Sequence, residues 1–361
     1  MNNIHYVNLH ALLYNFYYEY DAFNKKFNAL LTTAMENIES SKNNKHIHIC
    51  FASDNNYVPF LGTAILSILK SSAPDDSFLF HILDNGISAE SRKEIESLQS
   101  IRPFDIEFIK TDTSKFRDCV LSEKRLTTAI FCRYFIPEYI KEDKIIYLDC
   151  DIMARSSLSE LWNTDLEDSY VAGTPDYHVM KNGKFGGLFG GKLDLSEYIN
   201  SGVLLINCKK WREDGLPARM LELTVKNSAM LKFPDQDIIN FVCQGRKKII
   251  PHSWNVMGFL YKPDLFCERP DFEEIIKQRE DCRIRHFQPW RRNWFMPHKE
   301  EYISLLAESP WKDRIPKDDS RKKVLAENIL RYFWKHPFCV FKPSFYFQWK
   351  MRGTECLFNG W

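Results

Sequence analysis

The stretch at residues 144–153 constrains the fold most, because it is typical of a buried strand that ends in two acids. An apolar lead at 145–148 is followed by Asp149 and Asp151, one residue apart. Removing two adjacent carboxylates from water costs several kcal/mol unless a cation or several hydrogen-bond donors neutralise their charge. We therefore expect them at the carboxyl end of a strand, facing Mg²⁺ or Mn²⁺, which favour oxygen ligands and bridge to a diphosphate. The alternative is two acids on a solvated strand end, which the apolar lead disfavours.

Strands and helices alternate along the chain, which predicts an α/β sheet with parallel pairing and helices on both faces. We predict the other core strands at residues 46–52, 78–83, 106–109, 170–177, 198–207 and 284–287. We predict helices at residues 59–69, 88–101, 127–139, 158–162 and 234–242. Pro59 suits a first helical turn, and Ser88 suits an N-cap. Ligands bind such sheets at the carboxyl ends of the strands, where Asp54, Asn56 and the two acids fall.

Composition excludes several classes of protein. The 361 residues are 44% hydrophobic, enough for one large globular domain or two small ones, and the net charge of +1 provides no field for nucleic acid. The ten cysteines are scattered singly, several of them in apolar runs, which predicts reduced thiols in a cytosolic protein. The sequence predicts neither a signal peptide nor a membrane span.

The sequence predicts three regions. Residues 1–44 form an aromatic-rich helical extension that closes with a polar linker, 45–300 the main domain, and 301–361 a basic aromatic tail. Between Arg321 and Trp361 lie eight Lys or Arg, two acids and eleven aromatic residues. This composition is typical of peripheral contact with an anionic membrane, here the inner face of the cytoplasmic membrane. The alternatives are a helix folded back on the domain and, less favoured, a nucleic-acid groove.

Other polar positions keep two interpretations each. Arg133 is a surface or interhelical charge, or it grips phosphate or braces the acids. Gly202, after Asn200 and Ser201, permits close approach of a ligand or marks a bulge. The five glycines within residues 181–192 lack a dinucleotide-binding spacing and indicate a mobile loop.

The last two predicted elements also carry polar residues that have more than one explanation. Asp235 and Asp237 lie in the first turn of a predicted helix, where capping explains either acid but does not require Gln236. His286, in the last predicted strand, is either a structural residue or a metal ligand.

Five segments together resemble glycosyltransferase family 8, above all its bacterial branch of lipopolysaccharide and lipooligosaccharide α-galactosyl- and α-glucosyltransferases. The segments are FASDNNY at 51–57, FCRY at 131–134, YLDCDI at 147–152, NSGVLLIN at 200–207 and DQDI at 235–238. The resemblance covers roughly residues 46–300. It implies a GT-A fold, a Rossmann-like mixed sheet that binds a UDP-sugar with Mn²⁺ and transfers the sugar with retention. UDP-galactose or UDP-glucose is the implied donor, and a glycan or glycolipid is the implied acceptor.

The resemblance also implies roles for individual residues. The uridine segment is matched by Ala52, Asp54, Asn56 and Tyr57, with Asp54 accepting from the uracil N–H and Tyr57 stacking on the ring. The metal ligands are matched by Asp149, Asp151 and His286, and a residue near the nucleotide-sugar is matched by Arg133. Positions around the donor sugar and its anomeric carbon are matched by Asp176, Asn200, Asp235 and Gln236.

One segment departs from the family pattern. After the histidine that His286 matches, the family usually continues with a glycine and then a Lys-Pro-Trp that reaches the diphosphate. In this chain the sequence at 286–294 is HFQPWRRNW. Arg292 falls at the lysine position, with Arg291 beside it, and an arginine can grip diphosphate with a planar fork.

Two other classes of protein remain open at this point. A haloacid-dehalogenase-type phosphatase or phosphotransferase also opens with an apolar strand and Asp-x-Asp, although its motif usually lies near the N-terminus. A non-catalytic UDP-sugar-binding protein would keep the same ligands without turnover. For a retaining transferase we favour attack by the acceptor from the face that UDP leaves, with Gln236 in a positional role, because a neutral amide is a poor nucleophile.

Overall fold

A computed structural model describes residues 46–121, 127–261, 265–287 and 298–314. The chain divides into two units, Met1–His46 and Ile47–Trp361, and nearly all described residues belong to the second. The predicted N-terminal extension, and the tail from residue 315 onward, lie outside the described residues.

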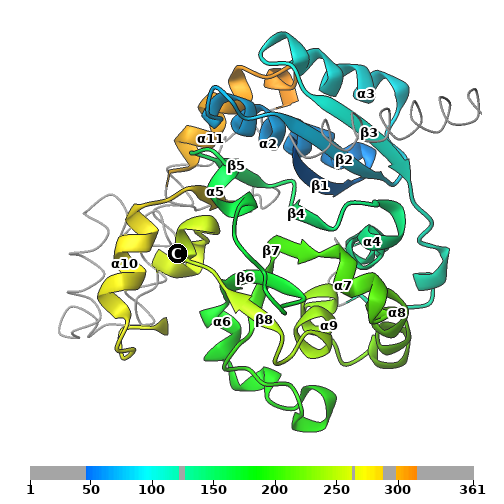
Figure 1. The fold of residues 1–361 in the computed structure, drawn as a ribbon, viewed down its shortest axis with the longest axis vertical. Coiled ribbons are helices and arrows are strands. Elements are labelled where there is room, and N and C mark those ends of the chain that lie inside the picture. Colours follow the sequence, from blue (N-terminus) through cyan, green and yellow to red (C-terminus); the bar gives the residue numbers. More distant parts are fainter. Residues whose placement is uncertain (1–45, 122–126, 262–264, 288–297, 315–361) are drawn as a thin grey trace, which may run out of the picture. The chain divides into compact units, whose positions relative to one another are not determined.

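A seven-stranded mixed sheet forms the centre of the second unit (Figure 1). Its strands, in spatial order, are β3 (Asp105–Lys110), β2 (Phe78–Asp84), β1 (Ile47–Ser53), β4 (Lys144–Leu148), β7 (Ile199–Asn207), β6 (Val171–Pro175) and β8 (Lys247–Ile249). Strands β1 to β4 pair in parallel, but β7 runs antiparallel to both β4 and β6. The mixed sheet that the family resemblance implies is therefore confirmed, whereas the parallel pairing expected from the alternation of strands and helices does not hold for β7. The α-helices between β4 and β7, α5 (Ser159–Trp162) and α6 (Tyr177–Met180), are four residues long, so no long crossover helix links the two strands.

Helices cover both faces of the sheet, as predicted. Strand residues alternate between two apolar cores, with Ile49 and Ile146 in one and Cys50 and Tyr147 in the other. The first core packs against α2 (Val58–Ser71), α3 (Ala89–Glu96) and α11 (Lys299–Ala307). The second packs against α4 (Ile136–Tyr139), α7 (Cys208–Glu213), α8 (Leu216–Asn227) and α9 (Pro234–Val242). Burial on both faces explains why a central strand such as β4 is a continuous apolar run after Lys144.

The acids follow the carboxyl end of a strand, as predicted, but the residues after them form a second strand. β4 ends at Leu148, and β5 (Ile152–Ala154) pairs with β9 (Ile284–His286) in a separate antiparallel sheet. The chain turns between them, where both acids lie. A sequence that is apolar on either side of the acids cannot reveal this change of sheet, because both strands are buried.

Further segments differ from the predictions. The helix predicted at 127–139 is a 3-10 helix, Thr128–Phe135, followed by α4, which restarts the helix with Pro137 in its first turn. Residues 181–192 form two short 3-10 turns, Gly183–Phe185 and Leu188–Gly191, whose Phe185 and Leu188 are buried. The helices α6, α7, α8 and α10 (Phe272–Glu280) and the short strand β8 have no counterpart among the predicted elements.

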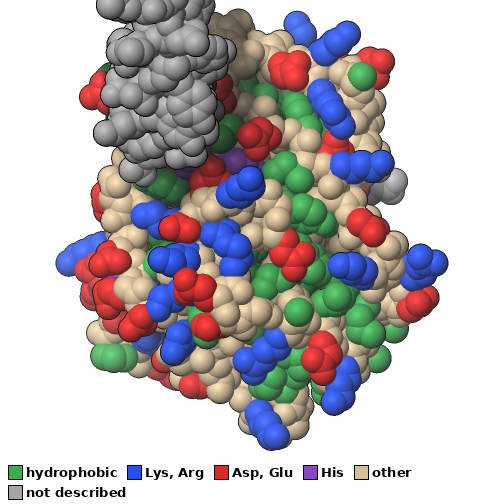
Figure 2. Space-filling model, turned by 45° about the vertical axis from the view of Figure 1, so that its right-hand side comes forward, with side chains coloured by type: hydrophobic (Ala, Val, Ile, Leu, Met, Phe, Trp, Pro, Cys, Tyr) green, Lys and Arg blue, Asp and Glu red, His purple; other side chains and the backbone are tan. Residues whose placement is uncertain are grey.

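Several general predictions can be compared with the described residues. α11 straddles the boundary predicted at residue 300, and its Tyr302 and Leu306 belong to the first core. All cysteines in the described part of the chain are free thiols. Within that part no helix is both long and apolar enough to cross a membrane. On the face in Figure 2, basic and acidic side chains are interspersed, in keeping with the net charge of +1.

Candidate active site

Two acids and a histidine meet beside the end of β4. Asp149 follows β4, Asp151 precedes β5, and His286 ends β9. Because Ile152 pairs with His286, the imidazole lies next to Asp151. Its Nε2 is 3.2 Å from Oδ1 of Asp151 and 3.9 Å from Oδ2 of Asp149. Ligand atoms of all three residues lie within 4.8 Å of one another, so the side chains predicted to bind a metal share one site.

The donor atoms of this site fit a divalent cation. Oδ2 of Asp151 is buried and has no hydrogen-bond partner among the described residues, so its lone pairs lack a positive partner. Nδ1 of His286 lies 3.0 Å from the amide oxygen of Asn255. That oxygen can only accept, so Nδ1 carries a proton and Nε2 faces the acids, the orientation that a ligand histidine needs.

Gly202 makes room for the histidine. A Cβ at this position would lie 2.2 Å from Cε1 of His286 and 2.8 Å from Oδ2 of Asp149, closer than van der Waals contact allows. The Gly202 carbonyl accepts a hydrogen bond from the N–H of Asp149 at 2.8 Å. This bond holds β7 against the turn that follows β4. Of the two interpretations of this glycine, close approach is therefore the one that the geometry supports.

Arg133 is buried between two acids, so its interpretation as a surface charge is wrong. Nη2 lies 3.0 Å from Oδ1 of Asp149, and Nη1 lies 2.9 Å from Oδ2 of Asp235. The guanidinium also stacks on Tyr147, whose hydroxyl donates to the same Asp149 oxygen at 3.0 Å. Two donors thus hold Oδ1 of Asp149 and leave Oδ2 directed at His286.

The pKa shifts follow from burial and from these pairs. Burial raises the pKa of Asp151 and of Asp235, although His286 and Arg133 respectively oppose the rise. Burial alone would lower the pKa of His286, but the adjacent Asp151 and Asp149 outweigh it and raise the pKa. A divalent cation would favour the opposite states, with charged carboxylates and a neutral imidazole.

A chain of amide hydrogen bonds leads from His286 to Asp176. The Nδ2 group of Asn255 donates to Oδ1 of Asn200 at 2.9 Å, and Nδ2 of Asn200 donates to Oε1 of Gln236 at 2.9 Å. Nε2 of Gln236 then donates to Oδ2 of Asp176 at 3.1 Å. Three positions implied to surround the donor sugar are therefore hydrogen-bonded to one another and, through Asn255, to the implied metal ligand.

The two acids in the first turn of α9, Asp235 and Asp237, have different roles. Asp237 accepts from the N–H groups of Lys232 and Phe233 at 2.7 and 3.0 Å, so it is the acid that satisfies the free donors there. Asp235 instead accepts from the hydroxyl of Ser201 at 3.0 Å and pairs with Arg133. Capping therefore accounts for Asp237 but not for Asp235.

A cleft connects the acids to the carboxyl end of β1. Its lining residues are Ala52, Ser53, Asp54, Tyr57, Thr127, Ala129, Ile130, Arg133, Tyr147, Asp149, Cys150 and Asp151. Oδ1 of Asp54 accepts from the N–H groups of Asn56 and Tyr57, which fixes the turn after β1. Asn56 is exposed and is not among the lining residues. Arg292 and Arg291 lie outside the described residues.

Three residues of this site did not emerge as functional candidates from the sequence. Asn255 holds the imidazole, Ser201 contacts Asp235, and the Tyr147 hydroxyl contacts Asp149. Ser201 adjoins Asn200, and Tyr147 lies within the acid motif, so proximity could have suggested both. Asn255 follows an aromatic 3-10 turn, His252–Trp254, and carries no motif of its own.

The model of glycosyl transferase family 8 matches residues 48–293. The chain belongs to this family. A putative glycosyltransferase of Haemophilus influenzae is 33% identical over 227 residues, which cover 61% of this chain and 68% of that protein. The lipopolysaccharide 1,2-glucosyltransferase of Escherichia coli K12 is 25% identical over 293 residues, which cover 79% and 84% of the two chains.

The solved structures support the same conclusion. The galactosyltransferase LgtC, in complex with donor and acceptor sugar analogs, is 28% identical, with a TM-score of 0.63 over 73% of this chain and 96% of LgtC. The predicted GT-A-like fold is therefore confirmed, as is the resemblance to family 8 and its lipopolysaccharide glycosyltransferases. Because the chain belongs to glycosyltransferase family 8, its Asp-x-Asp motif is that of a transferase. The haloacid dehalogenase alternative is therefore no longer supported.

Proposed function

We propose that this family-8 glycosyltransferase moves a hexose, galactose or glucose, from a UDP-sugar to a glycan acceptor, with retention and with a divalent cation. The observation that carries the proposal is the convergence of Asp149, Asp151 and His286 at one end of a cleft. At the other end of this cleft lie Ala52, in the last part of β1, and Asp54 and Tyr57, which follow that strand.

In this proposal the cleft holds the nucleotide. Tyr57 stacks on the uracil, Asp54 accepts from its N–H group, and Asn56 contributes from the adjoining turn. Tyr57 is half-buried at the start of α2, so its ring is held while part of its surface stays available. Arg292 is proposed to grip the diphosphate.

Asp149, Asp151 and His286 would hold the cation, and two carboxylates with one imidazole favour Mn²⁺ over Mg²⁺. When bound, such an ion supplies positive charge opposite the diphosphate, where negative charge grows as the bond to the sugar breaks. Arg133 contributes by orienting Asp149 and by neutralising Asp235, both of which it contacts directly.

The amide chain is proposed to bind the sugar. Asp176, Asn200 and Gln236 offer carboxylate and amide groups, the kinds that hydrogen-bond to sugar hydroxyls. The oxygen of Gln236 already accepts from Nδ2 of Asn200 and from the N–H of Ser201 at 3.0 Å. An amide oxygen engaged by two donors is a weak nucleophile, which favours a positional role for Gln236 and attack by the acceptor on the face that UDP leaves.

The acceptor is proposed to be lipopolysaccharide core or another surface glycan. Support comes from the E. coli relative, a lipopolysaccharide 1,2-glucosyltransferase. Such acceptors are membrane-linked, and the basic aromatic composition of residues 321–361 suits contact with the inner face of the cytoplasmic membrane.

A donor screen tests the proposal. Purified protein with Mn²⁺ is incubated with a panel of UDP-, GDP- and CMP-sugars, and release of the free nucleotide is measured. We expect release of UDP from UDP-galactose or UDP-glucose. Consumption of only GDP- or CMP-sugars would contradict the role of Asp54. Binding of UDP with Mn²⁺ but without turnover across a broad acceptor panel would favour the non-catalytic alternative.

A further inference from the structure

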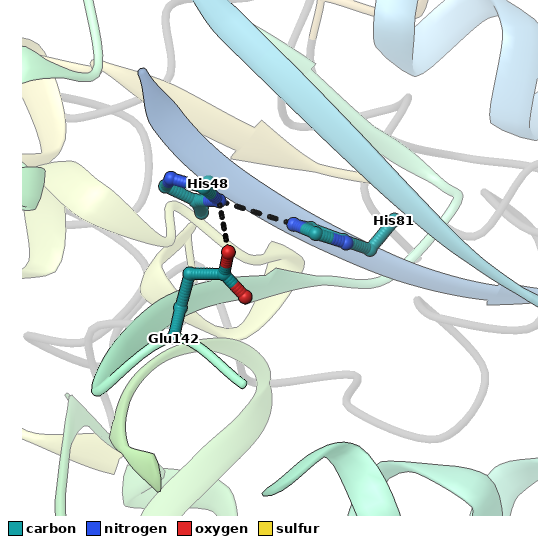
Figure 3. Close-up of side chains that lie close together, drawn as sticks. All are labelled: His48, His81 and Glu142. Carbon is teal, nitrogen blue, oxygen red and sulfur yellow. Dashed lines mark hydrogen bonds and ion pairs between the residues drawn. The ribbon is translucent and has the colours of Figure 1, made fainter. Parts of the chain in front are cut away.

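A second group of metal-ligating side chains lies at the other end of β1. His48 near the start of β1, His81 on β2 and Glu142 before β4 bring one ligand atom each to within 4.8 Å of the others. Figure 3 shows both imidazoles and the carboxylate directed toward one another. Along a strand that rises about 3.3 Å per residue, His48 lies about 13 Å from Ala52 of the proposed nucleotide cleft. The cluster is therefore separate from that site.

The spacing of the ligand atoms fits a tetrahedral ion. Nδ1 of His48 lies 3.1 Å from Nε2 of His81 and 3.7 Å from Oε1 of Glu142. A tetrahedral zinc with bonds of 2.0–2.1 Å has ligand-to-ligand edges of about 3.3 Å. Both distances lie near that edge, so an ion could be accommodated with small movements of the side chains.

The surroundings of His81 match those of a ligand histidine. Its other nitrogen, Nδ1, lies 3.2 Å from Oε2 of Glu107 on β3. A carboxylate that accepts from one ring nitrogen fixes the tautomer and turns the other lone pair toward a metal.

The charges and access of the cluster also suit an ion. Both imidazoles are 2% exposed, and the Glu142 side chain is 22% exposed. The histidines thus sit in the interior, with a route to solvent on the Glu142 side. One carboxylate at the ion and a second behind His81 offset the charge of a divalent cation in this interior.

We propose that His48, His81 and Glu142 bind a zinc ion that ties together β1, β2 and the segment entering β4. Two imidazoles and one carboxylate are a ligand set that zinc takes, with solvent as a fourth ligand. Because β1 and β4 both continue into the proposed nucleotide cleft, the ion would stabilise the strands that carry that cleft.

Cobalt spectroscopy on the full-length protein tests the proposal without relying on activity. The metal-free protein receives one equivalent of Co²⁺, whose four-coordinate complexes absorb visible light much more strongly than six-coordinate ones. We expect an intense band in the wild type that persists in Asp151→Asn, disappears in His81→Gln, and is abolished by one equivalent of Zn²⁺. Absence of the band in the wild type, its loss in Asp151→Asn, or its survival in His81→Gln would overturn the proposal. If His48 and His81 are only a hydrogen-bonded pair that binds no metal, the wild type shows no such band.

Two variants outside the core guard against misfolding of His81→Gln. Glu107→Gln changes a side chain that is 57% exposed. We expect the Kd of this variant for Zn²⁺ to be about 10–100-fold higher than that of the wild type, as measured in competition with a chromophoric chelator. Glu142→Gln removes a ligand and should raise the Kd at least as much, whereas the exposed Glu138→Gln serves as a control and should match the wild type. Zinc should raise the Tm of the wild type and of Glu138→Gln by the same amount. It should raise the Tm of Glu142→Gln by less. Wild-type affinity in both Glu107→Gln and Glu142→Gln would refute the site.

Discussion

Nε2 of His286 lies 3.2 Å from Oδ1 of Asp151, although the two residues come from strands that are far apart in the sequence. The two-stranded sheet of β5 and β9 creates this contact by pairing Ile152 with His286. The proposed metal site therefore depends on a small sheet outside the main one. Substitutions that weaken this contact should act on the metal first.

Asp151→Asn should reduce turnover with a UDP-sugar by at least about 10²–10³, the usual cost of losing one aligned electrostatic partner. The substitution keeps the shape of a buried side chain but removes a charged ligand. UDP release at saturating Mn²⁺ is the measurement. Turnover within about tenfold of the wild type would remove the metal hypothesis.

Gly202→Ala should weaken Mn²⁺ binding and leave the protein folded. The added Cβ would lie 2.2 Å from Cε1 of His286, so the imidazole has to move away from the acids. We expect a higher Mn²⁺ concentration for half-maximal UDP binding, measured by calorimetry. Gly187→Ala is the matched control, because nothing lies within 4 Å of a Cβ there. Equal Mn²⁺ dependence in the two variants would contradict the proposed position of the metal.

Asn255→Ala should lower Mn²⁺ affinity about 10–100-fold, the typical effect of removing the partner that orients a ligand histidine. Asn255 accepts from Nδ1 of His286 at 3.0 Å and is fully buried. Titration of Mn²⁺ in the presence of UDP measures the change. The exposed Asn163→Ala should leave the affinity unchanged. An unaltered affinity in Asn255→Ala would show that His286 does not bind the ion.

Arg133→Met should lower the free energy of unfolding by about 3–5 kcal/mol, because breaking a buried ion pair leaves uncompensated charge. Asp149 and Asp235 both lose the cation that pairs with them, and Asp235 is itself buried. Urea unfolding followed by circular dichroism gives the value. Adding Asp235→Asn should recover part of the loss, whereas Arg117→Met, on the surface, should cost little. Full stability in Arg133→Met would contradict the paired state.

His252→Phe should make stability less sensitive to acid. Burial lowers the pKa of His252 to about 4, below the 6.5 of an ordinary histidine, and neither ring nitrogen has a hydrogen-bond partner among the described residues. Between these pH values the unfolded chain binds a proton that the folded chain does not, so stability falls as pH falls. At pH 5 this histidine costs about 2 kcal/mol relative to pH 7.

The difference between urea midpoints at pH 7 and pH 5 measures this effect. It should shrink by that amount in His252→Phe, whose ring can keep the contacts with Tyr177 and Phe259. The exposed His178→Gln should retain the wild-type difference. An unchanged difference in His252→Phe would refute the prediction.

Local patterns predicted most of the elements. The strand at Phe78–Asp84 and the helix at Pro234–Val242 were visible because apolar runs and helix-start residues are local signals. Ser88 accepts from the N–H of Ser91, as its predicted capping role requires. The 3-10 form of Thr128–Phe135 and the antiparallel direction of β7 were missed, because neither leaves a periodic mark in the sequence.

By itself the sequence determined which residue types this protein brings to its site: two acids after an apolar run, and a histidine in a short strand near the end of the domain. Only the tertiary structure decided that Arg133 is buried between Asp149 and Asp235, and that Asn255 holds His286. The physical reason is that periodicity reports which face of an element is apolar, whereas the partner of a buried polar group is set by the packing of elements from distant parts of the chain.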